Sequence, residues 1–144
     1  MNIKELQDSI GKREIKFRAW DKKRKEWVNW HYHCIDENGT VSFYKSNILE
    51  ADENFPILMQ YTGLKDKNDK EIYEGDIVRY YIMQNGTEMN GVGFIVYDEG
   101  FSQFVCRAKI KGLNDLQDYP LRVEMRFTEF KVIGNIFENS NLIK

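Results

Sequence analysis

Hydrophobic and polar residues alternate with a period of two along much of this chain. Residues 14–20 show the pattern, with one side of the segment formed by Ile15, Phe17 and Ala19. Such alternation is typical of a strand with one buried face. A polar turn over residues 21–25 separates this segment from a second predicted strand over 26–34. The short spacing predicts an antiparallel hairpin.

The chain continues with short strands and turn signals. Strands are predicted over residues 41–44 and 57–61, the first of them after the tight turn signal Asn38-Gly39. Residues 47–54 are acidic and irregular, with a helical turn as the alternative. Gly63 is predicted to end the strand that starts at Ile57, and residues 65–70 have the composition of an exposed turn.

The second half of the chain predicts a small barrel. Strands are expected over residues 77–83, 92–97, 101–108, 121–127 and 131–137. Residues 113–120 are predicted as a loop, and Thr128 and Glu129 break the pattern before the last strand. Five short strands with this break are the order of an SH3-like β-barrel.

The facing of two of these strands can be predicted. The alternation over residues 121–127 predicts that the side chains of Val123, Met125 and Phe127 point into the core. The strand over 77–83 predicts at least one buried residue of the pair Ile77 and Val78.

The predicted fold class is mainly β, with an N-terminal antiparallel β unit followed by a small SH3-like β-barrel. The predicted divisions are a tail over residues 1–12, a β subdomain over 13–64 and the barrel subdomain over 65–144. In the tail, Ile3, Leu6 and Ile10 fall on one helical face. Two interpretations stay open for it: a frayed tail, or a turn of helix docked on a partner.

Composition and charge set limits on the kind of protein. The 144 residues carry a net charge of −2, which argues against a chain built wholly around a polyanion. No apolar run approaches the roughly 18 residues of a membrane span, and no secretory signal is evident. Cys34 and Cys106 are far apart and lack a C-x-x-C spacing. We therefore expect a cytoplasmic protein with two reduced thiols and no membrane segment.

Candidate metal and phosphate motifs are incomplete. The segment His31-x-His33-Cys34 lacks the further ligands of a structural zinc site, because the chain holds no other histidine. Residues 66–71 match a calcium loop poorly, since Glu71 stands where that loop requires glycine. Gly91-Val92-Gly93 lies among strands, whereas a phosphate cradle needs a helix N-terminus. We expect no metal site and no cofactor.

Candidate catalytic groups are equally sparse. Glu71, Glu74 and Asp76 could act as an acid–base pair, but their place at a predicted turn favours solvated carboxylates and a strand entry shaped by Gly75. No nucleophile pattern accompanies the two histidines. We expect no catalytic residues and a protein that is not an enzyme.

One basic segment is a stronger candidate for a binding site than these motifs. Residues 12–25 hold eight basic and two acidic residues, a local charge of +6. Such a cluster beside tryptophans can bind phosphates and stack unpaired bases. The alternative is a solvated turn whose tryptophans are buried at a subunit contact or against the second unit. The candidate contact residues for nucleic acid or a partner are Arg18, Trp20, Lys22, Lys23, Arg24, Lys25 and Trp27.

Four ungapped segments carry a more specific signal. They are R-E-I-K-F-R-A-W-D over residues 13–21, M-Q-Y-T-G-L-K-D over 59–66, E-I-Y-E-G-D-I-V over 71–78 and V-I-G-N-I-F-E-N over 132–139. Together they resemble the YopX family of small proteins from bacteriophages, prophages and mobile elements. The resemblance implies a biological setting and a fold, and it implies no biochemical activity.

These observations lead to two functional hypotheses. The first is a phage- or prophage-encoded accessory protein that works through protein contacts or self-assembly, as a homo-oligomer or with an unidentified phage or host protein. The high content of aromatic residues on short strands with exposed edges favours self-association. The alternative is a weak nucleic-acid-binding module that uses the basic hairpin over residues 12–25 without regard to sequence.

Overall fold

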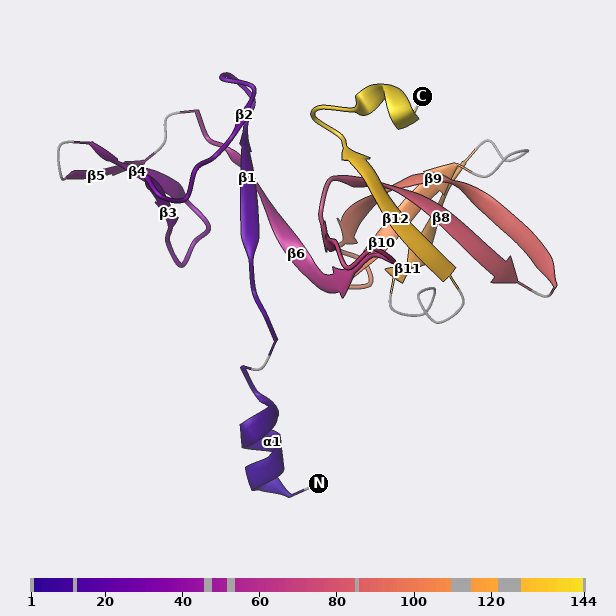
Figure 1. Ribbon diagram of the computed structural model, residues 1–144. Coiled ribbons are helices and arrows are strands. Elements are labelled where there is room, and N and C mark those ends of the chain that lie inside the picture. The colour runs from indigo at the N-terminus through magenta and orange to yellow at the C-terminus, as the bar shows by residue number, and fades with distance from the viewer. Residues whose placement is uncertain are drawn as a thin grey trace. The chain divides into compact units, whose positions relative to one another are not determined.

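A computed structural model describes residues 2–11, 13–45, 48–51, 54–84, 86–109, 115–121 and 128–143. The fold is mainly β and its sheets are antiparallel, which confirms the predicted class (Figure 1). The chain divides into two compact units. We call Lys16–Gln60 the small unit, and Met1–Ile15 with Tyr61–Lys144 the large unit.

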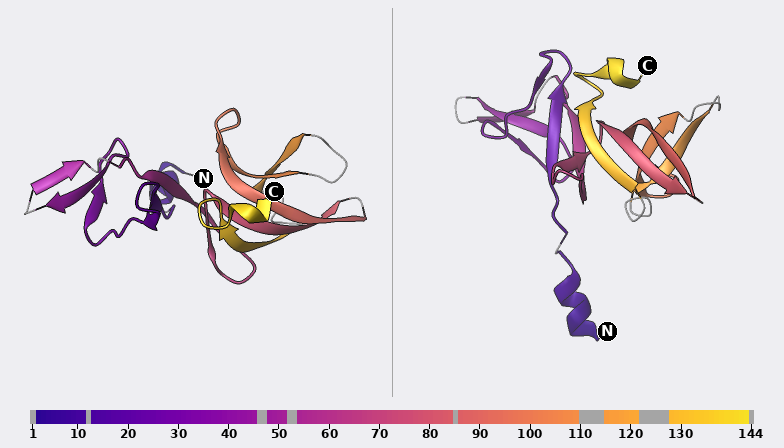
Figure 2. Two further views of the ribbon diagram at one scale, coloured as in Figure 1. Left: turned by 90° about the horizontal axis from the view of Figure 1, so that it is seen from above. Right: turned by 45° about the vertical axis from the view of Figure 1, so that its right-hand side comes forward.

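The large unit is built on a five-stranded sheet in the order β11-β10-β9-β8-β12. Its strands are β8 (Asp76–Gln84), β9 (Thr87–Asp98), β10 (Gln103–Lys109), β11 (Leu116–Pro120) and β12 (Thr128–Asn135). The last strand, β12, returns to pair with the first, β8, and the sheet is strongly curled (Figure 2). This order is consistent with the predicted SH3-like arrangement. The 3-10 helix η1 (Ser140–Ile143) follows β12.

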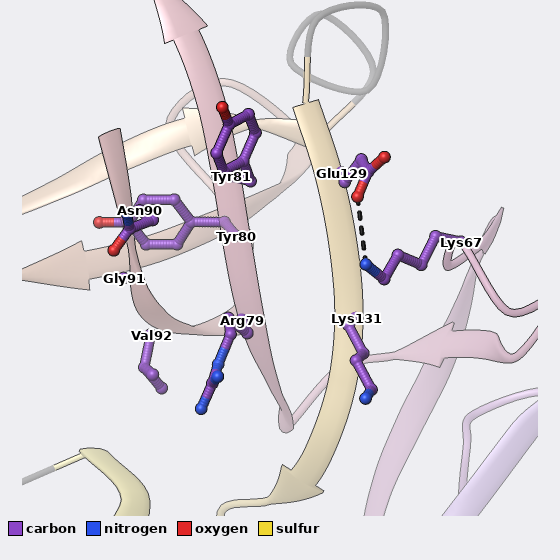
Figure 3. A pocket seen from close by; sticks show the side chains of 9 residues that line it. All are labelled: Lys67, Arg79, Tyr80, Tyr81, Asn90, Gly91, Val92, Glu129 and Lys131. Atoms are coloured by element: carbon purple, nitrogen blue, oxygen red, sulfur yellow. Dashed lines mark hydrogen bonds and ion pairs between the residues drawn. The ribbon is translucent and has the colours of Figure 1, made fainter. Parts of the chain in front are cut away.

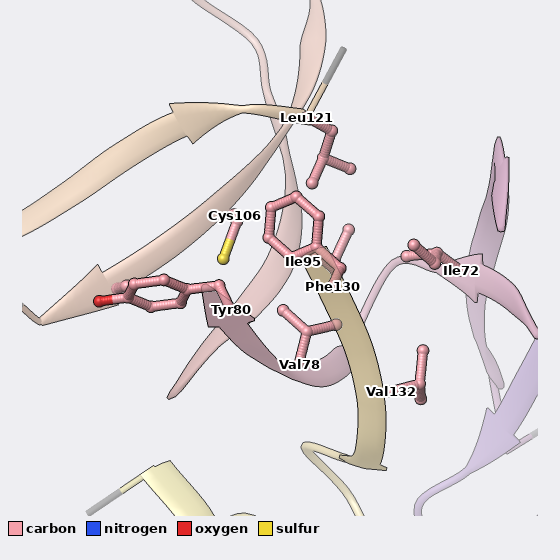
Figure 4. Packing of buried hydrophobic residues seen from close by; sticks show 9 residues of the cluster. Ile72, Val78, Tyr80, Ile95, Cys106, Leu121, Phe130 and Val132 are labelled. Carbon is pink, nitrogen blue, oxygen red and sulfur yellow. The ribbon is translucent and has the colours of Figure 1, made fainter. Parts of the chain in front are cut away.

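The concave side of this sheet encloses a hydrophobic cluster (Figure 4). Alternate residues of each strand enter the cluster, because neighbouring side chains of a strand point to opposite faces. Its buried members are Ile72, Val78, Tyr80, Ile95, Cys106, Ala108, Leu121, Phe130 and Val132. Ile77 and Val78 are both 0% exposed, which confirms the prediction for that pair. Val123, Met125 and Phe127 lie outside the described residues.

Strand β6 (Ile57–Lys65) runs through both units. In the large unit it pairs with β7 (Glu71–Tyr73), and the register shifts between Tyr61 and Lys65. Gly63 sits inside this irregularity with a φ of +84°, a conformation that glycine adopts without strain. The prediction that Gly63 ends the strand is therefore wrong, because the glycine forms a bulge and the strand continues.

Buried polar groups hold the turns of the large unit in place. The Asp66 carboxylate accepts hydrogen bonds from the amides of Asn68, Lys70 and Val132 at 2.8, 3.0 and 2.9 Å. This one side chain thereby shapes the β6–β7 turn and ties it to β12. Burial alone would raise the pKa of Asp66, but these three amides outweigh it and the pKa lies below its ordinary value.

Hydrogen bonds of Gly75 and Asn135 also fix turns of the large unit. Gly75 has a φ of +78°, donates to the Ile95 carbonyl at 2.8 Å and accepts from the Ile136 amide at 2.9 Å. The Asn135 carbonyl side chain accepts from the amides of Phe137 and Glu138, both at 3.0 Å. These contacts fix the chain directly before β8 and directly after β12.

The small unit contains two sets of short, paired strands. β1 (Phe17–Asp21) pairs with β2 (Glu26–Trp27) on one side and with the first part of β6 on the other. β3 (His33–Ile35), β4 (Val41–Lys45) and β5 (Ile48–Ala51) form a three-stranded meander. Among the residues of this unit whose burial is described, the buried apolar side chains are those of Ala19, Trp20, Val41 and Met59.

The predicted hairpin exists, but its second strand is shorter than expected. The strand predicted over residues 26–34 is interrupted by a turn at Asn29, whose side chain accepts from the His31 amide at 2.9 Å. The Asn29 carbonyl also accepts from the Tyr32 amide at 3.0 Å. Asparagine competes with strand pairing in this way, so the strand stops at Trp27.

Other predicted segments also differ from those in the structure. Residues 116–120 form strand β11 instead of a loop, and Arg107 on β10 faces Asp118 on β11 across the register. Thr128 and Glu129 belong to β12, and residues 48–51 form β5. These segments pair as strands because a neighbouring strand supplies their hydrogen bonds, although their own side-chain pattern is irregular.

Candidate functional site

The turn between β1 and β2 presents four basic side chains. Its backbone is organised by Asp21, whose side chain is 1% exposed. One carboxylate oxygen accepts from the amides of Lys23 and Arg24, each at 2.8 Å, and the other accepts from the Asn54 amide side chain at 2.9 Å. The Lys25 amide closes the turn on the Asp21 carbonyl at 2.8 Å. A single buried carboxylate therefore fixes the basic turn.

The electrostatics of Asp21 follow from these contacts. Burial by itself would raise its pKa, but the hydrogen bonds from Arg24, Asn54 and Lys23 outweigh burial and lower the pKa. The Arg24 guanidinium adds an ion pair with the carboxylate at 3.5 Å. Lys22, Lys23 and Lys25 are exposed. The turn thus holds a buried negative charge beneath a cationic surface.

The two tryptophans beside this turn are not equally accessible. Trp20 is 7% exposed, so its ring cannot stack on a base. Trp27 is half-buried and meets Trp20 edge to face, with ring centroids 5.0 Å apart. The Arg18 guanidinium lies over the Trp27 ring at 4.8 Å from its centroid, as a cation–π pair. The structure therefore brings all seven predicted contact residues together, with Trp20 inside the fold.

The N-terminal helix α1 (Ile3–Ser9) carries an apolar stripe. The helix begins with a capping box, in which Asn2 and Glu5 exchange side-chain and backbone hydrogen bonds at 2.9 Å. No residue of α1 is buried, and Ile3, Leu6 and Ile10 are 74%, 49% and 79% exposed. The tail is thus a capped helix with its hydrophobic face open.

A pocket of about 470 Å³ lies in the large unit, on β8, β9 and β12 (Figure 3). Its lining residues are Lys67, Arg79, Tyr80, Tyr81, Asn90, Gly91, Val92, Glu129 and Lys131. The register places Lys131, Arg79 and Val92 in one row across the three strands. Glu129, Tyr81 and Asn90 form the neighbouring row. The pocket is therefore a product of strand pairing.

The pocket is mainly cationic. Lys67 forms an ion pair with Glu129 at 3.1 Å, and its amide donates to the Phe130 carbonyl at 3.0 Å. Arg79 and Lys131 stand directly opposite each other on β8 and β12, and both are exposed. This site was not apparent from the sequence. Both cations occupy polar positions of predicted strands, and only the pairing of β8 with β12 brings them together.

No histidine or cysteine is among the described residues that line this pocket. His31 packs against the Tyr32 ring with centroids 4.8 Å apart, and the His33 ring lies 2.9 Å from the Asn29 carbonyl oxygen. Both cysteines are free thiols, and burial raises the pKa of Cys106 to about 12. Among the described residues no cluster of three or more metal-ligating side chains occurs. No helix in the described part of the chain is long and apolar enough to cross a membrane.

These features define a class: a small, mainly β protein of two units, joined by one long strand, with polar residues buried at its turns. The YopX protein family matches residues 16–144. The chain belongs to the YopX family.

Two solved structures are similar to this chain. Protein EF1440 from Enterococcus faecalis is 27% identical, with a TM-score of 0.54 over 91% of this chain and 99% of that one. Protein YopX from Bacillus subtilis is 19% identical, with a TM-score of 0.53 over 89% of this chain and 97% of that one, and this likeness concerns the fold. No curated protein matches the sequence.

Proposed function

We propose that this protein is a phage- or prophage-encoded accessory protein of the bacterial cytoplasm that acts through protein contacts, beginning with copies of itself. Membership of the YopX family supports the biological setting. The observation that carries the proposal is the capped helix α1, whose exposed apolar residues Ile3 and Leu6 are followed by the exposed Ile10 at its C-cap.

The sequence determines where the helix begins, but a helix this short is not stable on its own. A helix of seven residues is far below the roughly 12–15 residues at which isolated helices become marginal in water. The capping box sets where it begins, and burial of Ile3, Leu6 and Ile10 would supply the missing stabilisation. A partner that covers this stripe therefore also stabilises the helix.

The partner we propose for the stripe is a second copy of the chain. Leu6 lies between Ile3 and Ile10, so two helices that pair antiparallel about a twofold axis bring Ile3 of one copy near Ile10 of the other. Successive residues of a helix are about 100° apart around its axis, so the uncharged residues Gln7 and Ser9 lie on either side of the stripe. No charge at the seam repels a second copy, because the charged residues lie on the far side of the helix.

The expected association is weak. Stable interfaces bury roughly 1,200–2,000 Å² in total, and three side chains from each copy supply only part of that area. We therefore expect a dissociation constant in the micromolar range or above for this contact. The contact depends on apolar burial and is expected to persist at high salt.

Sedimentation velocity over a range of protein concentrations tests this proposal. The wild-type chain is expected to shift from monomer to dimer at high micromolar concentration. Leu6→Lys should weaken dimerisation by tenfold or more, because it places a charge in the seam. Asp8→Lys places a lysine on the far side of the helix and should retain the dimer. A wild-type chain that stays monomeric, or a Leu6→Lys variant that dimerises normally, contradicts the proposal.

A second candidate function is weak, sequence-insensitive binding of nucleic acid by the basic hairpin. The observation that favours it is the Asp21-anchored turn, which holds Lys22, Lys23 and Lys25 in solvent. Phosphates could contact these cations directly. A base could stack on Trp27 only by displacing the Arg18 guanidinium from the ring.

Fluorescence anisotropy with labelled single- and double-stranded oligonucleotides tests this candidate. Affinity should fall with salt, with a log–log slope of roughly −0.7 for each phosphate contacted on a single strand. Combined charge reversal at Lys22 and Lys23 should abolish binding without loss of stability. The matched control is charge reversal at the exposed Lys4 and Lys109. Absence of binding at low salt by folded protein rules this candidate out.

A further inference from the structure

The pocket on β8, β9 and β12 offers two chemically different ends. One end has the paired cations Arg79 and Lys131, and the other has the ring of Tyr81 (Figure 3). These residues lie on the outer face of the sheet, opposite the buried Val78 and Tyr80. A volume of about 470 Å³ lies within the range of roughly 300–1,000 Å³ that holds small ligands.

The cationic end is unfavourable without a ligand. Arg79 and Lys131 are direct cross-strand neighbours, and like charges in this relation destabilise a sheet. Figure 3 shows both side chains extending in the same direction. Neither forms an ion pair with another residue of the described ranges 54–84, 86–109 and 128–143. An anion between them would remove the repulsion and gain two charge-assisted contacts.

The chemistry of these two cations favours a phosphate group. A guanidinium binds two phosphate oxygens at once in a planar fork, and a lysine ammonium adds a point charge. The only other cation of the pocket lining, Lys67, is paired with Glu129 at 3.1 Å. The anion therefore belongs at Arg79 and Lys131, away from the Glu129 carboxylate.

The other end of the pocket suits a flat, nitrogen-rich ring. Tyr81 is 39% exposed, and its hydroxyl lies 3.8 Å from the Met83 sulfur, so the ring face is the part it offers to a ligand. Asn90 lies opposite Tyr81 in the register and carries an amide that both donates and accepts. Glu129, on the other side of Tyr81, can accept from ring amino groups.

We propose that this pocket binds a nucleoside phosphate, with the phosphate between Arg79 and Lys131 and the base against Tyr81 and Asn90. The source is either a free nucleotide or one nucleotide unit of a single strand, because both present the same chemistry to these residues. The site shares no residue with the stripe on α1 or with the basic hairpin over residues 12–25. Its test therefore stands independently of the proposed function.

Isothermal titration calorimetry of the full chain with AMP, adenosine and inorganic phosphate tests the site. AMP is expected to bind more tightly than either fragment. Replacing both cations, in Arg79→Gln with Lys131→Gln, should weaken AMP binding by at least tenfold. Tyr81→Ala should weaken AMP binding by roughly tenfold through loss of stacking and leave phosphate binding unchanged. Lys109→Gln, an exposed cation outside the pocket, is the matched control.

Three further measurements separate the alternatives. A labelled oligodeoxyadenylate, compared with AMP at equal nucleotide concentration, distinguishes a strand from a free nucleotide. Charge reversal at Lys22 and Lys23 should leave AMP binding unchanged, since that turn belongs to the small unit. Arg79→Gln should maintain or raise the melting temperature of the ligand-free protein, whereas a merely structural arginine would lower it.

Specific results overturn the proposal. The proposal is wrong if AMP binds no more tightly than adenosine or inorganic phosphate. It is also wrong if the variant with both Arg79→Gln and Lys131→Gln binds AMP with unchanged affinity. Equal binding of phosphate and AMP, with no effect of Tyr81→Ala, would overturn the assignment of the base. A lowered melting temperature of Arg79→Gln would overturn the assignment of Arg79 as a ligand-binding cation.

Discussion

The two units of this protein are each stabilised by a different kind of interaction. The large unit encloses a continuous apolar cluster, and buried polar groups such as Asp66 fix its turns. In the small unit fewer apolar side chains are buried among the described residues, and Asp21 and the Trp20–Trp27 pair organise the hairpin. A larger core gives the large unit more stability to lose, because burial of each aliphatic side chain contributes about 1.5–3 kcal/mol.

The comparison also explains what the family segments encode. Gly63, Asp66, Gly75 and Asn135 all lie in these segments; Gly63 forms the bulge of β6, and the other three shape or anchor turns of the large unit. In the small unit Asp21 has the same role. The residues that carry the resemblance to the YopX family therefore specify the fold. None of the pocket cations Lys67, Arg79 and Lys131 lies within them.

The units can be followed separately because all three tryptophans, Trp20, Trp27 and Trp30, lie in the small unit. Tryptophan fluorescence therefore reports on the small unit. Far-ultraviolet circular dichroism reports mainly on the longer strands of the large unit. The following predictions use this difference.

The largest effect is expected from a charge in the core of the large unit. Val78 is 0% exposed, so Val78→Asp buries a carboxylate without a partner. We expect a loss of about 4 kcal/mol or more, enough to unfold the large unit. The circular dichroism signal should collapse at room temperature. Arg79→Asp, one residue along and exposed, is the control and should keep the fold. A folded Val78→Asp variant would show that the facing of β8 is wrong.

A buried carboxylate gives the next largest effect. Asp66→Ala leaves the buried Val132 amide without its acceptor, which should cost about 1–3 kcal/mol of unfolding free energy. Urea denaturation followed by circular dichroism measures this loss. Asn68→Ala, in the same turn but exposed, should change stability by less than about 0.5 kcal/mol. Equal effects of the two substitutions would contradict the anchoring role.

The pH dependence of both units follows from the same chemistry. Asp66 and Asp21 have folded-state pKa values below their ordinary value of 3.8. A carboxylate of this kind stabilises the folded state above 3.8, and the contribution disappears as the pH falls through the folded-state pKa. Unfolding midpoints should therefore drop in acid. Asp21→Asn should reduce the acid sensitivity of the fluorescence midpoint only, and Asp66→Asn that of the circular dichroism midpoint only.

Close backbone packing in the large unit predicts a further effect. A Cβ on Gly93 would lie 2.7 Å from the Cys106 sulfur and 2.9 Å from the Arg107 carbonyl oxygen. Gly93→Ala should therefore cost about 1–3 kcal/mol by overpacking. Gly100→Ala, whose Cβ would meet only the Asp98 carboxylate at 3.3 Å, is the control. Thermal unfolding should show a lower midpoint for the first variant alone, with unchanged fluorescence at room temperature.

The smallest effect belongs to a surface ion pair. Arg107 and Asp118 form two hydrogen bonds across β10 and β11 at 2.7 and 2.6 Å. Their side chains are 35% and 30% exposed, so a double-mutant cycle should give a coupling of only about 0.2–1 kcal/mol. The coupling should shrink at high salt. A salt-independent coupling well above this range would mean that the pair is effectively buried.

Local sequence patterns determined the fold class and several of its turns. Alternation of period two indicated strands because neighbouring side chains of a strand face opposite sides, which is a local property. The hairpin with its turn at residues 21–25 followed from it, and so did the burial of at least one residue of the pair Ile77 and Val78. The four family segments were recognisable because glycines and short polar side chains at turns tolerate few replacements.

Only the tertiary structure decided which strands are neighbours and which side chains are covered. The sequence left open whether Trp20 is a contact residue or is buried, and pairing with β2 and β6 leaves it 7% exposed. Residues 116–120 became a strand because β10 offers them hydrogen bonds. Arg79 and Lys131 became partners because β12 closes onto β8. Such pairings join distant segments, and side-chain periodicity carries no information about the distant partner.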